Sequence, residues 1–211
     1  MAEKKSGLHA IISTPFVYNL VQWVAGAKLY RERMVANYIQ PFEGCRILDI
    51  GCGTGEYAEY FKKRISKFEY FGFDGEESYI EWGKKHFEGD LRVQLFHKIL
   101  TEEEIKEFNN FDIVIATGVM HHLDDELVVS LLNLSKKALK PGGKLVTYDP
   151  GNYEDANAIE RFFVKNDRGR SIRFKEGYEA LIRQVFPRYI AHIPYLTWFK
   201  VRNIVFECFN D

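Results

Sequence analysis

Residues 47–57, which read ILDIGCGTGEY, decide the fold of this 211-residue chain. The apolar run 45–50 leads directly into three glycines, and residues 57–64 then have the composition of a helix. Glycine permits backbone conformations and a close ligand approach that a side chain would block. The order of strand, tight turn and helix therefore predicts a ligand that rests on the turn.

The chain after this turn alternates between predicted strands and predicted helices, which is typical of a parallel α/β sheet. Residues 188–195 and 200–209 form the last two predicted strands, and their short separation predicts an antiparallel hairpin at the sheet edge. Residues 149–169 are polar, and we expect them to be irregular. The other predicted strands cover residues 68–73, 91–96, 111–117 and 144–148.

Composition limits the class of protein. Apolar residues make up 46% of the chain and charged residues 28%, which is ordinary for a globular protein. The 29 Lys and Arg residues balance 30 Asp and Glu residues, so no global positive field favours nucleic acid. We therefore expect no nucleic-acid partner.

The cysteines and the hydropathy indicate a location. The three cysteines show no C-x-x-C spacing, which argues against a disulfide framework or a zinc cluster and fits a reducing cytosol. There is no signal-peptide core and no uninterrupted apolar span of about 20 residues. We expect a cytoplasmic protein without membrane insertion, whose oligomeric state cannot be read from the sequence.

The length fits one domain, because domains usually run to about 100–200 residues. Residues 15–39 carry apolar and aromatic side chains at three- and four-residue spacings, as amphipathic helices do. We expect an N-terminal helical lid over residues 1–44 on a ligand-binding domain formed by residues 45–211, in a single domain overall.

The glycine pattern differs from a dinucleotide fingerprint. Counted from Gly51, the G-x-G-x-x-G motif requires a third glycine where this chain has Glu56. Asp49 adds a negative charge that would repel a pyrophosphate but attract an ammonium or sulfonium cation. The loop therefore favours a cationic ligand.

Several motifs in order resemble those of the class I S-adenosylmethionine-dependent methyltransferases. LDIGCGTGEY resembles their motif I, and FGFDG at residues 71–75 resembles motif II. The likeness continues through FDIVIATGVMHHL at residues 111–123 and LKPGGKL at residues 139–145, and so covers roughly residues 45–149. It implies an α/β fold: a Rossmann-like, doubly wound, seven-stranded sheet with an antiparallel last strand and an N-terminal helical lid.

The resemblance also implies S-adenosylmethionine as the cofactor. Asp74 lies about 20 residues beyond the loop, where an acid can accept hydrogen bonds from ribose hydroxyls in NAD and S-adenosylmethionine sites alike. Similar enzymes often have an aspartate after strand three, where this chain reads FHKI (residues 96–99), so the adenine contact is not assigned. The candidate cofactor residues are Asp49, Gly51, Cys52, Gly53, Gly55, Asp74, Gly75, Glu76, Thr117 and Gly118, together with Tyr18, Gln22 and Arg31 from the lid.

Methyl transfer needs alignment more than a dedicated base, but a hydroxyl acceptor benefits from one. His121 and His122 follow a predicted strand and are the candidate catalytic residues, although packing or capping of the next helix is an alternative role. Adjacent residues seldom converge on one ion, so we expect no metal. The candidate acceptor contacts are Tyr148, Asp149 and Tyr153, and also Arg168, Arg170 and Arg173, which suit a phosphate or carboxylate.

The sequence thus predicts an enzyme that transfers methyl to oxygen or nitrogen of a small-molecule acceptor, such as a sugar or an anionic metabolite. Residues 117–120 read TGVM and lack the Asn/Asp-Pro-Pro-aromatic segment of enzymes that methylate the amines of nucleic-acid bases. An NAD-dependent Rossmann oxidoreductase and a non-catalytic S-adenosylmethionine-binding protein remain as alternatives.

Overall fold

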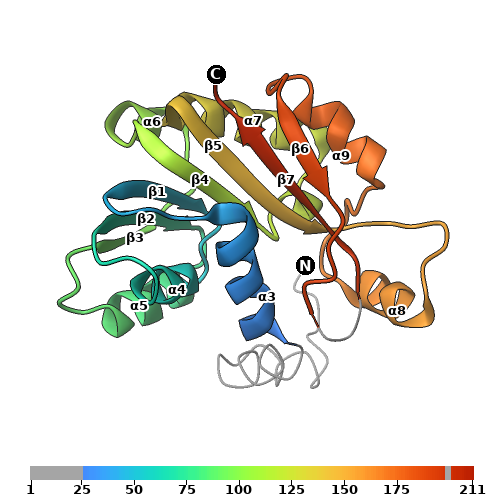
Figure 1. Cartoon of the computed structure of the whole chain (residues 1–211), viewed down its shortest axis with the longest axis horizontal. Helices are drawn as coiled ribbons and strands as arrows, with labels where there is room; N and C mark the ends of the chain where they lie inside the picture. Colours follow the sequence, from blue (N-terminus) through green and yellow to red (C-terminus); the bar gives the residue numbers. More distant parts are fainter. Residues whose placement is uncertain (1–25, 198–200) are drawn as a thin grey trace, which may run out of the picture.

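A seven-stranded sheet in the order β3-β2-β1-β4-β5-β7-β6 runs through the centre of the molecule (Figure 1). The structure is a computed structural model that describes residues 26–197 and 201–211. The strands are β1 (Cys45–Ile50), β2 (Phe68–Asp74), β3 (Val93–His97), β4 (Phe111–Thr117), β5 (Leu139–Pro150), β6 (Tyr189–His192) and β7 (Asn203–Phe209).

The strand directions confirm the predicted sheet. β1 pairs in parallel with both β2 and β4. From β1 the chain first adds β2 and β3 on one side and then adds β4 and β5 on the other, so the strand order reverses between β1 and β4. β7 is antiparallel to both β5 and β6, which confirms the antiparallel last strand and the hairpin at the edge. β1 and β4 are buried along almost their whole length, as central strands covered on both faces must be.

Helices cover both faces of the sheet. One apolar core joins the sheet to α6 (Glu102–Glu107), α7 (Asp125–Ala138) and α9 (Lys175–Ile182). The other joins it to α4 (Glu56–Lys62), α5 (Glu77–His86) and the N-terminal pair α3 (Ala27–Met34) and η1 (Val35–Ile39). Met34, Val35 and Ile39 are fully buried in this second core. The described part of the predicted lid is therefore packed onto the sheet, while the division at residue 44 stays a prediction.

Residues 149–169 are not irregular throughout, so that prediction is wrong. They contain the end of β5 and the helix α8 (Ala158–Asn166), which lies beyond the edge of the sheet (Figure 1). Asn157 caps α8 by accepting hydrogen bonds from the backbone of Ile159 and Glu160, and the Glu160 carboxylate accepts one from the Asn157 N–H. This capping box is an N-x-x-E signal that the sequence carried.

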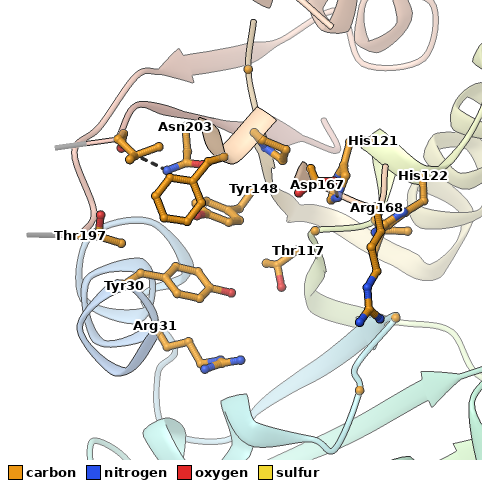
Figure 2. A pocket seen from close by; sticks show the side chains of 18 of the residues that line it. Tyr30, Arg31, Thr117, His121, His122, Tyr148, Asp167, Arg168, Thr197 and Asn203 are labelled. Carbon is orange, nitrogen blue, oxygen red and sulfur yellow. Dashed lines mark hydrogen bonds and ion pairs between the residues drawn. The ribbon is translucent and has the colours of Figure 1, made fainter. Parts of the chain in front are cut away.

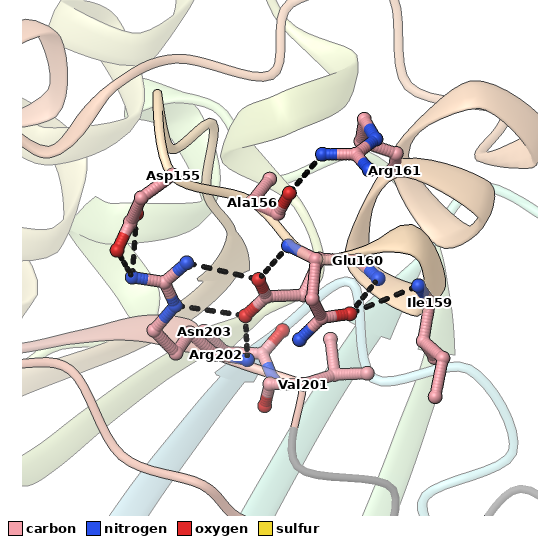
Figure 3. A network of polar contacts seen from close by, with 9 residues as sticks. Asp155, Ala156, Ile159, Glu160, Arg161, Val201, Arg202 and Asn203 are labelled. Carbon is pink, nitrogen blue, oxygen red and sulfur yellow. Dashed lines mark hydrogen bonds and ion pairs between the residues drawn. The ribbon is translucent and has the colours of Figure 1, made fainter.

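A buried ion pair fastens α8 to the beginning of β7 (Figure 3). The Glu160 side chain receives Arg202 Nε at 2.8 Å and Nη2 at 2.9 Å, and Glu160 is only 2% exposed. The hydrogen bonds from Arg202 lower the pKa of Glu160 to about 2. Such bidentate pairing fixes both position and orientation. Arg202 also binds Asp155, so one guanidinium holds two points of the segment that precedes and begins α8.

No helix among residues 26–197 and 201–211 is both long enough and apolar enough to cross a membrane.

Candidate active site

A cavity of about 840 Å³ opens at the carboxyl edge of the sheet. It lies where the strand order reverses between β1 and β4, the place where open α/β sheets bind their ligands. One part, which we call the cofactor half, is lined by the loop after β1, by Asp74 and by α3. The other part, the acceptor half, is lined by His122, by α8 and the residues after it, and by the beginning of β7.

The glycine loop forms the floor of the cofactor half. Gly53 has φ +56°, and a Cβ built on it would meet no atom of the described residues within 4 Å, so among these residues its surface is open to a ligand. Gly51 also lines the cavity, but a Cβ there would lie 2.7 Å from Val119 Cγ2. Gly55 lies beneath the loop against Leu95 and does not line the cavity. Gly53 therefore presents an open face to the cavity, whereas Gly55 packs against Leu95 and Phe87.

Asp49 brings an unsatisfied negative group to this floor. Its side chain is 1% exposed, and Oδ2 accepts a hydrogen bond from the Tyr70 hydroxyl at 2.5 Å. Oδ1 has no partner among the described residues. Burial raises the pKa of Asp49 to about 7, against the opposing effect of the Tyr70 hydrogen bond. Because unpaired buried carboxylates are costly, this oxygen fits a cationic group that enters the cavity.

Asp74 holds the loop and faces the same space. Its Oδ2 accepts the Gly53 N–H and its Oδ1 accepts the Glu76 N–H, both at 2.8 Å. Each oxygen keeps a lone pair for a further donor, such as a ribose hydroxyl. Gly75 and Glu76 are exposed and do not line the cavity, although Cys52 does.

Helix α3 closes the cofactor half from the opposite side (Figure 2). Arg31, a predicted cofactor residue, lines the cavity and pairs with Glu56 at 2.7 Å. Tyr30, which the sequence reading missed, stacks on Tyr148 with ring centroids 4.7 Å apart. Tyr148 therefore lies against α3, and both rings line the cavity. The other two predicted lid residues, Tyr18 and Gln22, lie outside the described residues.

The two predicted histidines have different surroundings. His121 is buried, with Nδ1 2.8 Å from Asp149 Oδ1 and Nε2 3.3 Å from Asp167 Oδ1. Burial lowers the pKa of His121, but the bonds to the two carboxylates outweigh it and raise the pKa to about 9. His121 is thus an imidazolium at neutral pH, and both of its nitrogens are occupied.

His122 is exposed and lines the cavity. Partial burial, together with the charge of His121, lowers the pKa of His122. Its ring centroid is 4.0 Å from that of His121. A neutral imidazole at the cavity surface can accept a proton, so of the two candidates His122 has the state that a general base needs.

The three arginines that were predicted as acceptor contacts also differ in their surroundings, and only one of them lines the cavity. Arg168 lines the cavity and has no ion-pair partner within residues 26–197 and 201–211 (Figure 2). Arg173 does not line the cavity, because its guanidinium is bound to Asp125 at 2.6 Å and to backbone carbonyls that include that of Leu123. Arg170 is exposed outside the cavity.

Tyr153 and Asp149, two of the predicted acceptor contacts, do not line the cavity either. The Arg202 guanidinium covers the Tyr153 ring, 4.1 Å from its centroid. Asp149 is buried beneath His121. The acceptor half is instead completed by residues that the sequence did not identify: Phe163, Val164 and Asn166 of the unpredicted helix α8, Asp167 directly after it, and Thr197 and Asn203, which lie before and at the start of β7. Within the described ranges, no group of three or more His, Cys, Asp or Glu side chains could hold a metal.

Comparison with known proteins bears on the same region. Residues 47–143 match a family model described as a methyltransferase domain. A ubiquinone biosynthesis O-methyltransferase from Bradyrhizobium sp. (strain ORS 278) is 33% identical over 144 residues, which are 68% of this chain and 53% of that protein. A tRNA U34 carboxymethyltransferase from Pseudoalteromonas atlantica is 32% identical over 154 residues, which are 72% of this chain and 46% of that protein. The chain thus spans about half the length of these relatives.

The fold has a counterpart among solved structures. The pyocyanin biosynthetic protein PhzM superposes with a TM-score of 0.73 at 16% identity, over 97% of this chain and 62% of that one. At this identity the likeness concerns the fold. The family match agrees with the seven-stranded sheet and with the glycine loop that Asp49 and Asp74 flank. The chain therefore belongs to the class I S-adenosylmethionine-dependent methyltransferase family.

Proposed function

We propose that this protein transfers the methyl group of S-adenosylmethionine to an oxygen or nitrogen of a small-molecule acceptor that carries an anionic group. The observation that carries the proposal is the composition of one cavity. Its cofactor half has the open face of Gly53 and an Asp49 oxygen without a partner among the described residues, and its acceptor half has His122 and Arg168, which forms no ion pair with a described residue.

The cofactor half fits S-adenosylmethionine residue by residue. Asp49 would face the positively charged methionine part, and Asp74 would accept hydrogen bonds from the ribose. Arg31, on the opposite side, would attract the methionine carboxylate. The bound cofactor supplies a methyl group that its sulfonium already activates, so the protein has to align the acceptor and exclude competing groups.

The acceptor half fits an anionic molecule with a nucleophilic hydroxyl or amine. Arg168 is a planar donor suited to a phosphate or carboxylate, which includes sugars that carry such a group. His122 would take the proton that the nucleophile loses. The three cysteines are free and buried, so we also propose the reducing cytoplasm as the site of the reaction.

The proposed reaction is tested by measuring formation of S-adenosylhomocysteine with a panel of small hydroxyl and amino acceptors. Each acceptor is supplied with and without a carboxylate or phosphate, and transfer RNA is one arm because one relative is named for tRNA. We expect turnover with anionic small acceptors. We also expect His122→Asn to lower kcat by about 100-fold or more without changing cofactor affinity, the effect of losing a general base.

The other outcomes are distinct. Methylation of transfer RNA alone would overturn the proposed acceptor. Cofactor binding without turnover on any arm would indicate a binding protein. Binding of NADH, detected by its fluorescence, with no affinity for S-adenosylmethionine would favour an oxidoreductase.

Arg168→Gln is expected to raise KM for anionic acceptors by about 10–100-fold, the loss of one charge-assisted pair, and to leave KM for their neutral analogues unchanged. Arg170→Gln is the matched control, because Arg170 lies two positions away and outside the cavity. Initial rates over a range of acceptor concentrations measure both variants. Equal losses in the two variants would refute direct recognition by Arg168.

A further inference from the structure

His121 links two parts of the chain that meet at the acceptor half. On one side, both its backbone N–H and Nδ1 bond to Asp149 Oδ1, at 3.0 and 2.8 Å, and Asp149 belongs to the rigid strand β5. On the other side, Nε2 is 3.3 Å from Asp167 Oδ1, and Asp167 directly follows α8. The imidazole thus bridges the sheet and the segment 167–171.

The segment 167–171 is fitted closely around this imidazole. The Ser171 N–H donates to the His121 carbonyl at 3.0 Å, and the Gly169 N–H donates to Asp167 Oδ1 at 2.6 Å. A Cβ on Gly169 would lie 2.1 Å from His121 Cδ2, so only glycine allows the chain to pass so near the ring. Arg168 lies within this segment, between Asp167 and Gly169.

We propose that His121 is a positioning residue: the bridge from Asp149 to Asp167 holds the segment 167–171 against the sheet and thereby places Arg168 in the acceptor half. His121 does not act as the base in this arrangement, because both ring nitrogens are engaged. The term acceptor half rests on the function proposed above, whereas the bridge and its effect on the segment do not.

The charges around the ring determine when the bridge exists. Asp149 and Asp167 face it with negative charge, while His122 lies beside it and Arg168 and Arg173 are the neighbouring cations. The pKa of His121 is raised from 6.5 to about 9. A raised histidine pKa means that the bridge contributes fully below about pH 6.5 and is lost as the pH rises through about 9.

The test is hydrogen exchange of the full chain without ligand, so its outcome does not depend on any acceptor or on turnover. In His121→Asn the shorter amide can keep a bond to Asp149 but cannot reach Asp167. We expect the Ser171 amide to exchange at least about tenfold faster while amides of β1 and β4 keep their protection. Asp167→Ala cuts the same bridge from its surface side, where a folding defect is not expected, and should give the same result.

His122→Asn is the matched control and should leave Ser171 protection unchanged. In the wild-type protein, protection of Ser171, corrected for the intrinsic pH dependence of exchange, should fall between about pH 8 and pH 10. Asp167→Ala should lack this step. Unchanged protection in both bridge variants, or a pH step that persists without Asp167, would overturn the proposal even if the methyltransferase activity is established.

Discussion

Gly53→Val is expected to reduce the affinity for S-adenosylmethionine by at least about 100-fold. This factor corresponds to a loss of about 2.7 kcal/mol of binding free energy, similar to the loss of about two hydrogen bonds. The open face of Gly53 is the surface on which the cofactor would rest, and an isopropyl group there would fill that space. The left-handed φ of +56° also disfavours a β-branched side chain. Isothermal titration calorimetry with S-adenosylmethionine and with S-adenosylhomocysteine measures the effect.

Backbone strain is separated from the loss of the ligand surface by Gly89→Val. Gly89 has φ +81° and likewise has no atom of the described part of the chain within 4 Å of a built Cβ, but it does not line the cavity. Both variants should lose about 1–2 kcal/mol of unfolding free energy in urea, the cost of a left-handed residue with a side chain. Only Gly53→Val should lose binding. Normal affinity in folded Gly53→Val would mean that the cofactor lies elsewhere.

Asp49→Asn should change stability and binding in opposite directions. The wild-type side chain is buried, and its Oδ1 has no partner in residues 26–197 and 201–211, so removing its charge should raise the unfolding free energy of the ligand-free protein at pH 8 by about 1–3 kcal/mol. The same change removes the charge that faces the cationic cofactor, and affinity should fall by about 10–100-fold. Urea unfolding and calorimetry measure the two quantities.

The pH dependence follows from the raised pKa of Asp49, about 7 in the folded protein against 3.8 for the free side chain. Between these values the folded state binds a proton that the unfolded state lacks, so Asp49 lowers stability as the pH rises from about 4 to 7. If the ionised form binds the cofactor, affinity at pH 6 should be about tenfold weaker than at pH 8, because only about a tenth of Asp49 is then ionised. Asp49→Asn should lack both slopes.

A second buried acid provides the control for Asp49. Asp112 accepts the Arg46 N–H and pairs with Lys140, away from the cavity. Asp112→Asn should therefore reduce stability and leave cofactor affinity unchanged. A loss of stability in Asp49→Asn, comparable to that of Asp112→Asn, would contradict the proposed unpaired state of Asp49.

The sheet and the cofactor half could be predicted because their causes are local. The alternation of apolar strands and helices sets a parallel sheet, and the parallel pairing of β1 with β2 brings Asp49, Gly53 and Asp74 together at its carboxyl edge. Even here, Gly55 and Asp74 show that position in a motif does not fix a role. Gly55 supports packing, while Asp74 first holds the loop through the Gly53 N–H.

The acceptor half could not be predicted because it is formed by contacts between distant segments. Arg168 and Arg173 looked equivalent in sequence, but Asp125 and nearby carbonyls engage only Arg173. His121 and His122 are neighbours, yet only His121 meets the carboxylates of Asp149 and Asp167. These differences depend on which side chains meet across the fold, and no local spacing reports that.

The pairing of Glu160 with Arg202 has a consequence for changing what this protein accepts. The segment 151–174 carries much of the acceptor half, and its helix α8 is attached to the rest of the molecule through Arg202, which is distant in sequence. A segment transplanted from another member of the family would therefore need a matching residue 202, or a glutamate at its own position 160. The range of acceptors can then be redesigned by exchanging the segment 151–174 together with residue 202, while the glycine loop is left unchanged.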